Sequence, residues 1–388
     1  MHNESNLKLG FLIGAGVSMP AGMPSTEDIT NQVLSGERYY RHSNTIYDFF
    51  EDKLFACYVP AILEFLGWVK YDLTKFHYSE HPINYEDIYY IVEQLHDTIT
   101  NEFENPAISP LIDRYRLLFQ VLNEISFENN AIKALINHFD NDHEIFDKLI
   151  KESCNYIKDV VWHMLAKEVN CFKNLEVFRD IAQDSEINQF NIFSLNHDLM
   201  LEKAFESWQI NYNDGFIDQK ETTYSWRKNL ENRKEKVRLL KLHGSINWFR
   251  YGSSEIIEKI SPVPDSLERN SRPEFLVGTF NKMLHYTSVL YMSSVCEFFR
   301  SLNDISTLLV SGYSFGDKGI NNIIINWLNS IEENRMIIIC PEPEKTIQCA
   351  RGAIQNNWSE WNRLHKIITI QSGIESVQWL DLKKEIEF

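Results

Sequence analysis

A short strand that runs directly into a glycine-rich turn opens this chain and limits the folds it can adopt. Leu7 to Ile13 has the length and apolar composition of a buried strand, and Gly14-Ala15-Gly16 follows it at once. Ser25 to Leu34 then predicts a helix, with Ser25 or Thr26 as its N-cap. Strand, glycine turn and helix in this order are typical of the first unit of a dinucleotide-binding fold.

Short apolar runs and helical patterns alternate through the second half of the chain. The predicted strands are Phe190 to Leu195, Val237 to Leu242, Phe275 to Val277, Ile305 to Ser311, Met336 to Cys340 and Ile367 to Ile370. The predicted helices are Leu199 to Trp208, Tyr286 to Leu302 and Ile320 to Ile331. Such alternation predicts an α/β fold with a Rossmann-like, doubly wound parallel sheet. Two polar stretches, Asn211 to Lys236 and Tyr251 to Arg272, predict loops near a site.

The spacing of apolar residues changes between about Tyr39 and Ile181, where they recur at three- and four-residue intervals and glycine is scarce. We therefore expect a Rossmann-like domain at residues 1–38 and 186–388, interrupted by a helical insertion at 39–185. The aromatic residues of the insertion provide either a self-association surface or simply core. They include Tyr39, Tyr40, Phe49, Phe50, Tyr89 and Tyr90.

Composition and charge exclude several classes of protein. The net charge of −17 disfavours unaided binding to a phosphate backbone, although a local basic patch is still compatible with it. No apolar run approaches the roughly 18 residues of a membrane span, and the N-terminus lacks a signal-peptide pattern, so we expect a cytoplasmic protein. The six cysteines are scattered without a CxxC pair, so we expect neither a disulfide framework nor a four-cysteine zinc site.

Four segments carry the candidate site residues, and each follows a predicted strand. In open parallel sheets, ligands bind beyond the carboxyl ends of the strands. The first segment is Gly14 to Ser18, followed by Ala21-Gly22-Met23-Pro24. Its glycines allow a pyrophosphate to approach the backbone closely. Met19 stands where a GxGxxG motif has its third glycine, so a plain structural turn is the alternative.

The second and third segments supply polar side chains. Asn196 and Asp198 lie in Ser194-Leu195-Asn196-His197-Asp198, where a strand ends and a helix begins, so either residue is also a candidate helix N-cap. His243 follows another strand in Lys241-Leu242-His243-Gly244. Histidine titrates near neutrality, as a general base requires, and Gly244 would allow close approach to the ring. A structural histidine is the alternative.

The fourth segment is Ser311-Gly312-Tyr313-Ser314-Phe315-Gly316-Asp317, a turn of small residues after an apolar strand. Its backbone N–H groups are candidates for binding phosphate or ribose. A plain strand-to-helix turn, with Asp317 near the helix cap, is the alternative.

Taken in order, GAGVS with GMP, SLNHD, KLHG and SGYSFGD resemble the sirtuin superfamily, and more specifically the bacterial SIR2-like domains of antiphage defence systems. Asn84 to Ile88 and Val277-Gly278-Thr279 resemble the same branch. The resemblance covers most of the chain and is strongest at 9–34 and 188–343.

The resemblance implies a role for each motif residue. In this family the catalytic histidine lies near the ribose hydroxyls, which would be His243. Asn196 would hold a ribose or the attacking water, and Asp198 would face the nicotinamide carboxamide. The remaining NAD-binding residues would be Gly14, Ala15, Gly16 and Ser18 in the first turn, and Gly312 and Ser314 in the second phosphate- and ribose-binding turn.

Departures from the sirtuin pattern distinguish between activities. Sirtuin deacylases carry a zinc module of two cysteine pairs, which this chain lacks, and Leu195 stands where many of them have glutamine. Ser25-Thr26-Glu27 likewise replaces their Asp-Phe-Arg run. The resemblance therefore implies an NAD glycohydrolase that uses NAD as its substrate, water as acceptor and no metal. A protein deacylase and a non-catalytic module that senses NAD or ADP-ribose are the alternatives.

The resemblance also implies partners. Stand-alone SIR2-like proteins of this branch are often paired with a HerA-type hexameric ATPase, so we expect a homo-oligomer in a hetero-complex with such an ATPase. The expected role is NAD depletion in antiphage defence. We expect neither membrane association nor direct nucleic-acid binding.

Overall fold

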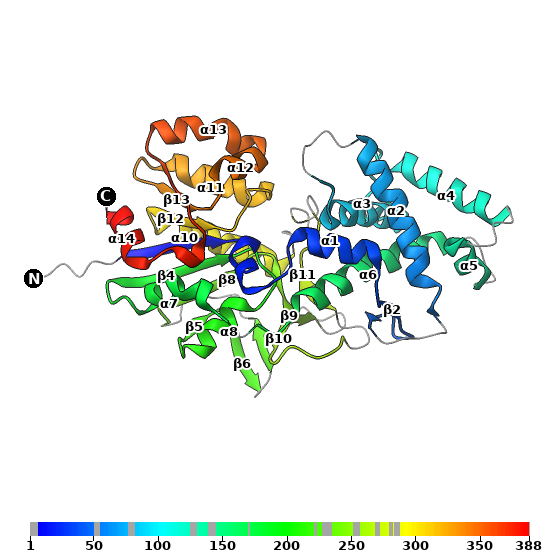
Figure 1. Ribbon diagram of the computed structural model, residues 1–388, viewed down its shortest axis with the longest axis horizontal. Coiled ribbons are helices and arrows are strands. Elements are labelled where there is room, and N and C mark those ends of the chain that lie inside the picture. Colours follow the sequence, from blue (N-terminus) through cyan, green and yellow to red (C-terminus); the bar gives the residue numbers. More distant parts are fainter. Residues whose placement is uncertain are drawn as a thin grey trace, which may run out of the picture.

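A seven-stranded parallel sheet and a lobe of helices lie side by side in the computed structural model (Figure 1). The structure describes residues 7–49, 55–76, 82–124, 130–138, 145–169, 171–220, 223–226, 235–250, 257–267, 272–278, 282 and 288–387. From edge to edge, the strands of the sheet are β14 (Ile367–Ile370), β13 (Arg335–Ile339), β12 (Thr307–Ser311), β1 (Leu7–Ile13), β4 (Ile187–Ser194), β8 (Val237–Lys241) and β5 (Tyr212–Asn213). All neighbouring strands run parallel.

The strand order has a switch point between β1 and β12. From β1 the chain builds outward through β4 and β8, and it then returns to the other side of β1 to add β12, β13 and β14. This is the doubly wound order, in which a crevice forms where the winding direction reverses. The predicted Rossmann-like sheet is confirmed, and the short edge strand β5 is an addition to it.

Alternate side chains of each strand enter two different cores. Leu9, Phe11 and Ile13 of β1 join one core, while Leu12 joins the other. The first core is covered by α7 (Glu176–Gln183), α8 (Met200–Ser207) and α14 (Trp379–Glu387). The second core is covered by α10 (Val289–Asn303), α11 (Lys318–Ser330), α12 (Pro343–Cys349) and α13 (Gly352–Arg363). Burial on both faces explains why the central strands are continuous apolar runs in the sequence.

The helical lobe lies at the right of Figure 1 and confirms the predicted helical insertion. Its helices are α2 (Tyr58–Phe76), α3 (Tyr85–Ile99), α4 (Ser109–Glu124), α5 (Ala131–His138) and α6 (Ile145–Leu165), preceded by a hairpin of β2 (Tyr40–Arg41) and β3 (Tyr47–Asp48). The helix α1 (Thr26–Ser35) begins at the predicted N-cap, where Ser25 and Asp28 form a capping box. The boundaries at residues 38/39 and 185/186 stay a prediction. Among the described segments, no helix combines the length and the apolar composition that crossing a bilayer requires.

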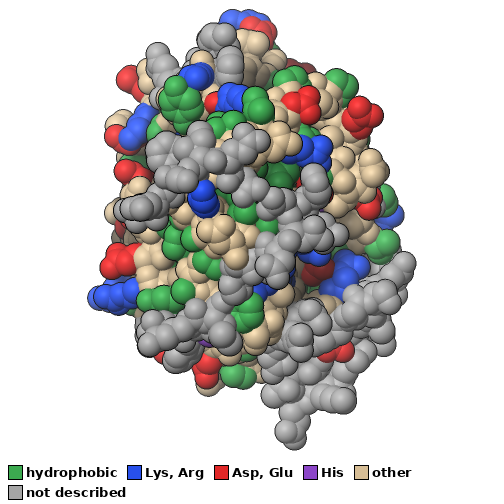
Figure 2. Space-filling model, turned by 90° about the vertical axis from the view of Figure 1, so that its right-hand side faces the viewer, with side chains coloured by type: hydrophobic (Ala, Val, Ile, Leu, Met, Phe, Trp, Pro, Cys, Tyr) green, Lys and Arg blue, Asp and Glu red, His purple; other side chains and the backbone are tan. Residues whose placement is uncertain are grey.

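The aromatic residues of the insertion mostly belong to its core. Tyr39 and Tyr89 are buried, and Tyr40 and Tyr90 are half-buried. Phe49 is exposed, and Phe50 lies outside the described residues. Figure 2 looks onto the helical end of the molecule, where hydrophobic side chains are scattered among charged and other side chains.

A second, antiparallel sheet corrects the expectation of two long loops. Its order is β11 (Pro273–Phe275), β9 (Gly244–Arg250), β10 (Ile257–Ile260), β7 (Thr223–Trp226) and β6 (Phe216–Lys220). Three of these strands lie within the stretches 211–236 and 251–272, so the loop prediction was wrong there. Short strands with many polar residues lack the apolar runs of the parallel sheet, and this concealed them in the sequence.

A close backbone contact joins the turns after β1 and β12. Gly16 N donates to Gly312 O at 3.1 Å, and Gly312 adopts φ +66°. A Cβ on Gly312 would overlap Val17 N and lie 2.8 Å from Gly14 O. A side chain at position 312 is therefore both sterically and conformationally unfavourable.

We predict that Gly312→Ala lowers the free energy of unfolding by about 3 kcal/mol, because the added methyl must separate two backbone turns in a left-handed conformation. Urea denaturation followed by circular dichroism measures this change.

Gly67→Ala is the matched control. Gly67 lies within α2, and a Cβ there would meet nothing within 4 Å. Alanine should stabilise this helix by about 1 kcal/mol or less. Equal stability of the two variants would contradict the proposed close contact.

Candidate active site

The two glycine turns lie at the switch point, where a doubly wound sheet forms its ligand-binding crevice. Gly14 N donates to Ser311 O at 3.0 Å, which fixes the first turn against the end of β12. Ala15 is exposed at this turn, and its amide donates to no acceptor among the described residues. Ser314 of the second turn is also exposed. The crevice thus presents backbone and hydroxyl groups suited to binding phosphate or ribose oxygens.

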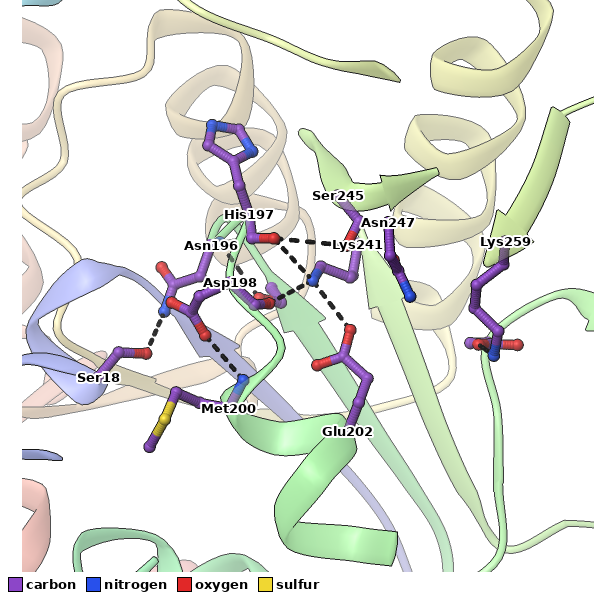
Figure 3. A network of polar contacts seen from close by, with 12 residues as sticks. Ser18, Asn196, His197, Asp198, Met200, Glu202, Lys241, Ser245, Asn247 and Lys259 are labelled. Carbon is purple, nitrogen blue, oxygen red and sulfur yellow. Dashed lines mark hydrogen bonds and ion pairs between the residues drawn. The ribbon is translucent and has the colours of Figure 1, made fainter. Parts of the chain in front are cut away.

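Asn196 joins the end of β4 to the first turn. Its Nδ2 donates to Gly14 O at 3.1 Å. It also donates to Ser18 Oγ at 3.1 Å (Figure 3). Because a carbonyl oxygen only accepts hydrogen bonds, the contact with Gly14 fixes the orientation of the amide. Both Nδ2 hydrogens are used within the protein, so Oδ1 is the atom that can accept a hydrogen bond from a ligand or a water. Asn196 and Ser18 are both buried.

Asp198 and the buried Lys241 hold the loop that carries Asn196. Asp198 Oδ1 accepts from Met200 N at 2.9 Å at the start of α8, although the N-cap of this helix is Leu199 and neither Asn196 nor Asp198. Lys241 Nζ donates to His197 O at 3.3 Å, to Asp198 O at 2.5 Å and to Glu202 Oε1 at 2.9 Å (Figure 3). The ammonium group thereby ties the end of β8 to the loop after β4 and to α8.

His243 pairs with Asp317 beyond the end of β8. His243 Nε2 lies 3.0 Å from Asp317 Oδ2, and both side chains are buried. Asp317 is also the N-cap of α11, because its Oδ1 accepts from the amides of Gly319 at 2.7 Å and Ile320 at 3.0 Å. The fourth sequence segment therefore supplies the group that orients the candidate catalytic histidine.

The charge states of the pair follow from burial and hydrogen bonding. Burial lowers the pKa of His243 below its ordinary value, and the hydrogen bond to Asp317 offsets this only in part. Burial alone would raise the pKa of Asp317. The hydrogen bond to His243 and nearby positive charge together outweigh burial and hold this pKa well below its ordinary value. The lowered pKa of each group therefore indicates a neutral imidazole beside an ionised carboxylate. Because a carboxylate only accepts, Nε2 must carry the proton, which leaves the lone pair on Nδ1.

Three further polar groups surround this pair. Lys282 Nζ lies 2.9 and 3.0 Å from the two carboxylate oxygens of Glu86, in the first turn of α3. After burial, the charge of Lys282 is among the causes that lower the pKa of His243. The ring of His197 lies 6.2 Å from that of His243, and burial holds its pKa well below the ordinary value. Both rings are therefore neutral at physiological pH.

The structure brings the predicted site residues to one edge of the sheet. The strands β12, β1, β4 and β8 are neighbours, and each of the four predicted segments follows one of them. Direct contacts link Asn196 to the first turn, that turn to Gly312, and His243 to Asp317. Asp198 Oδ1 bonds to the first amide of α8, and Thr279 of the VGT motif lies outside the described residues.

Sequence reasoning did not identify Asp317, Lys241, Glu86 or Lys282 as site residues. A signal existed for Lys241, since a lysine at the end of an otherwise apolar strand needs a buried partner. The sequence predicts Asp317 only as a helix cap, but a capping aspartate has a second carboxylate oxygen that can accept another hydrogen bond. Nothing in the sequence paired Glu86 with Lys282, which are 196 positions apart.

The six cysteines are all free, and the described residues contain no group of three or more His, Cys, Asp or Glu side chains arranged to hold a metal ion. The polar groups of the crevice are instead amides, hydroxyls and the histidine–carboxylate pair.

Comparison with known proteins relates part of the chain to one family. No curated protein matches the chain. A solved structure of a mutant Sir2 homologue with ADP-ribose is 12% identical, covers 98% of this chain and 92% of its own, and has a TM-score of 0.40. A Sir2 homologue with NAD is 11% identical, covers 98% and 89%, and has a TM-score of 0.41. At these values the superpositions are loose, and the fold assignment rests on the strand order.

The family model of the SIR2-like domain matches residues 191–363. This range overlaps the 188–343 stretch in which the family motifs are strongest, whereas 9–34 lies outside the match. Residues 191–363 thus match a SIR2-like domain, and they supply three of the four segments that border the crevice.

Proposed function

We propose that this protein hydrolyses the bond between nicotinamide and ribose in NAD. Water and NAD would yield nicotinamide, ADP-ribose and a proton. The observation that carries the proposal is the buried His243–Asp317 pair, which lies beyond the carboxyl ends of the parallel strands, as Asn196 does. The SIR2-like match over residues 191–363 and the glycine crevice support NAD as the ligand.

The chemistry follows from the protonation states. Departure of nicotinamide leaves an oxocarbenium-like ribose, which a positioned water can attack. Asn196 Oδ1 accepts a hydrogen bond and thereby orients that water or a ribose hydroxyl. The neutral His243 takes a proton on Nδ1, and the Asp317 carboxylate stabilises the imidazolium that results. In this proposal the exposed turn at Ala15 and Ser314 holds the phosphate and ribose groups.

The proposal extends to cellular role and assembly. It includes NAD depletion in antiphage defence, self-association and a hetero-complex with a HerA-type ATPase in the cytoplasm. Co-purification and mass measurement, with and without the candidate ATPase, test the assembly. Formation of O-acyl-ADP-ribose from an acyl-lysine peptide would instead favour the deacylase.

We predict that His243→Ala and Asn196→Ala each lower kcat for NAD cleavage by at least about a hundredfold, because each removes a group that acts on the reacting water or proton. Nicotinamide release by the purified full-length protein measures the effect.

Asn334→Ala is the matched control. The Nδ2 of this buried residue also donates to a carbonyl, Trp327 O at 2.7 Å, and to a hydroxyl, Ser330 Oγ at 3.4 Å, but away from the crevice. It should lose stability with little change in kcat. Equal kcat in all three variants would remove His243 and Asn196 from the reaction.

The pH dependence of kcat/KM should report the neutral form of His243. Because burial lowers its pKa below the ordinary 6.5, activity should be flat through neutral pH and fall only in more acidic buffer. Asp317→Asn removes a charge that raises this pKa, so the acid limb should move to lower pH. The rate should also fall at least about tenfold, since the imidazolium loses its partner.

Asparagine caps a helix as well as aspartate does, so α11 should survive the Asp317→Asn change. An acid limb that moves to higher pH, or an unchanged rate, would contradict the assigned role of Asp317.

A further inference from the structure

Helix α6 of the helical lobe reaches across to the strands that flank His243. Its residues Asp159 and Trp162 lie one turn apart, and both are 1% exposed. Each makes a hydrogen bond or ion pair outside the helical lobe. Neither residue belongs to a motif that the proposed function uses.

Trp162 acts on the loop that carries Asn196. Its indole Nε1 donates to Ile246 O at 2.9 Å in β9, and Ile246 N donates to His197 O at 3.1 Å. The backbone of Ile246 therefore links the indole to the residue next to Asn196. Because β9 begins at Gly244, the same hydrogen bond also fixes the strand that follows His243.

Asp159 acts on the other flank of His243 through Arg272. Arg272 donates to Asp159 from Nε at 2.7 Å and from Nη2 at 2.8 Å, and Pro273 then begins β11. In the segment after β11, Leu276 N donates to His243 O at 2.8 Å. A Cβ on Gly244, at φ +81°, would lie 2.8 Å from Phe275 Cα, so β11 and the backbone after His243 are in close contact.

We infer that Asp159 and Trp162 are positioning residues that hold His243 and the Asn196 loop in register across the crevice. The expected effect on kcat rests on the proposed function, whereas the contacts of Asp159 and Trp162 are independent of it. Both strands around the histidine are anchored to one face of one helix, so α6 sets the distance between the base and the amide. Any partner that moves α6 would change catalysis without touching the substrate.

A purely structural role predicts something different. Two buried hydrogen-bonding groups would then contribute to stability alone, as such groups do elsewhere in the fold. Trp361 provides that comparison, because it is also 1% exposed and its Nε1 donates to Asn329 Oδ1 at 3.0 Å, near the end of α11 that lies farthest from Asp317.

Trp162→Phe and Trp361→Phe are therefore the test pair. Both lose one buried indole hydrogen bond and should lower the melting temperature similarly. Only Trp162→Phe should lower kcat for NAD cleavage, by about tenfold or more, with KM within about twofold. Equal kcat in the two variants would overturn the inference.

Arg272→Lys and Arg41→Lys form a second pair. Arg41 makes the same two-bond contact with Glu152 of α6, at 2.9 and 2.7 Å, but precedes no strand of the crevice. Lysine keeps the charge and loses the paired geometry in both cases. Arg272→Lys should lower kcat and Arg41→Lys should not; the reverse order would contradict the inference.

A measurement independent of turnover separates this inference from the proposed function. With nitrogen-labelled histidine, the imidazole signal of His243 is assigned by its absence from His243→Ala. That signal should shift in Trp162→Phe and stay unchanged in Trp361→Phe. A wild type that cleaves no NAD would remove the proposed function, whereas an unshifted signal in Trp162→Phe would remove the positioning role.

Discussion

The contact between the turns after β1 and β12 is the constraint on which the rest of the structure depends. Gly16 and Gly312 share a backbone hydrogen bond at the point where the winding of the sheet reverses. Because β4 and β8 lie next to β1, this junction also fixes where Asn196 and His243 stand. A doubly wound sheet brings distant segments together only at this edge, so the candidate site follows from the strand order.

Burying a histidine, three carboxylates and two lysines wholly or partly near this end of the sheet would be costly if they were unpaired. The structure instead gives each charged group an acceptor or donor: Lys241 with Glu202, Lys282 with Glu86, and Asp317 with His243 and the first amides of α11. Burial lowers the pKa of His243 and so keeps the imidazole neutral, while the hydrogen bond from His243 lowers the pKa of Asp317 and keeps its carboxylate ionised. That combination is suited to accepting a proton, and a purely structural histidine has no need of it.

Much of the fold could be predicted from the sequence, because buried parallel strands are continuous apolar runs. The strands Leu7 to Ile13 and Ile367 to Ile370 have the predicted bounds, and Ser25 caps α1 as expected. The strands β6, β7 and β10 of the second sheet could not be predicted in the same way, since short polar strands have no such signal. Asn196 and His243 were identified by their positions after strands, but Asp317 and Glu86 act through contacts between distant segments that no local pattern encodes.

The central claim is that one nicotinamide riboside lies between the Asn196 amide and the His243 imidazole. A crystal structure of the His243→Ala variant soaked with NAD tests this claim most directly. The account predicts intact NAD along the crevice, with its phosphates at the Gly14–Ser18 turn and its nicotinamide ribose beside Asn196 Oδ1. NAD bound at another face of the sheet, or a crevice that stays closed to NAD, would contradict it.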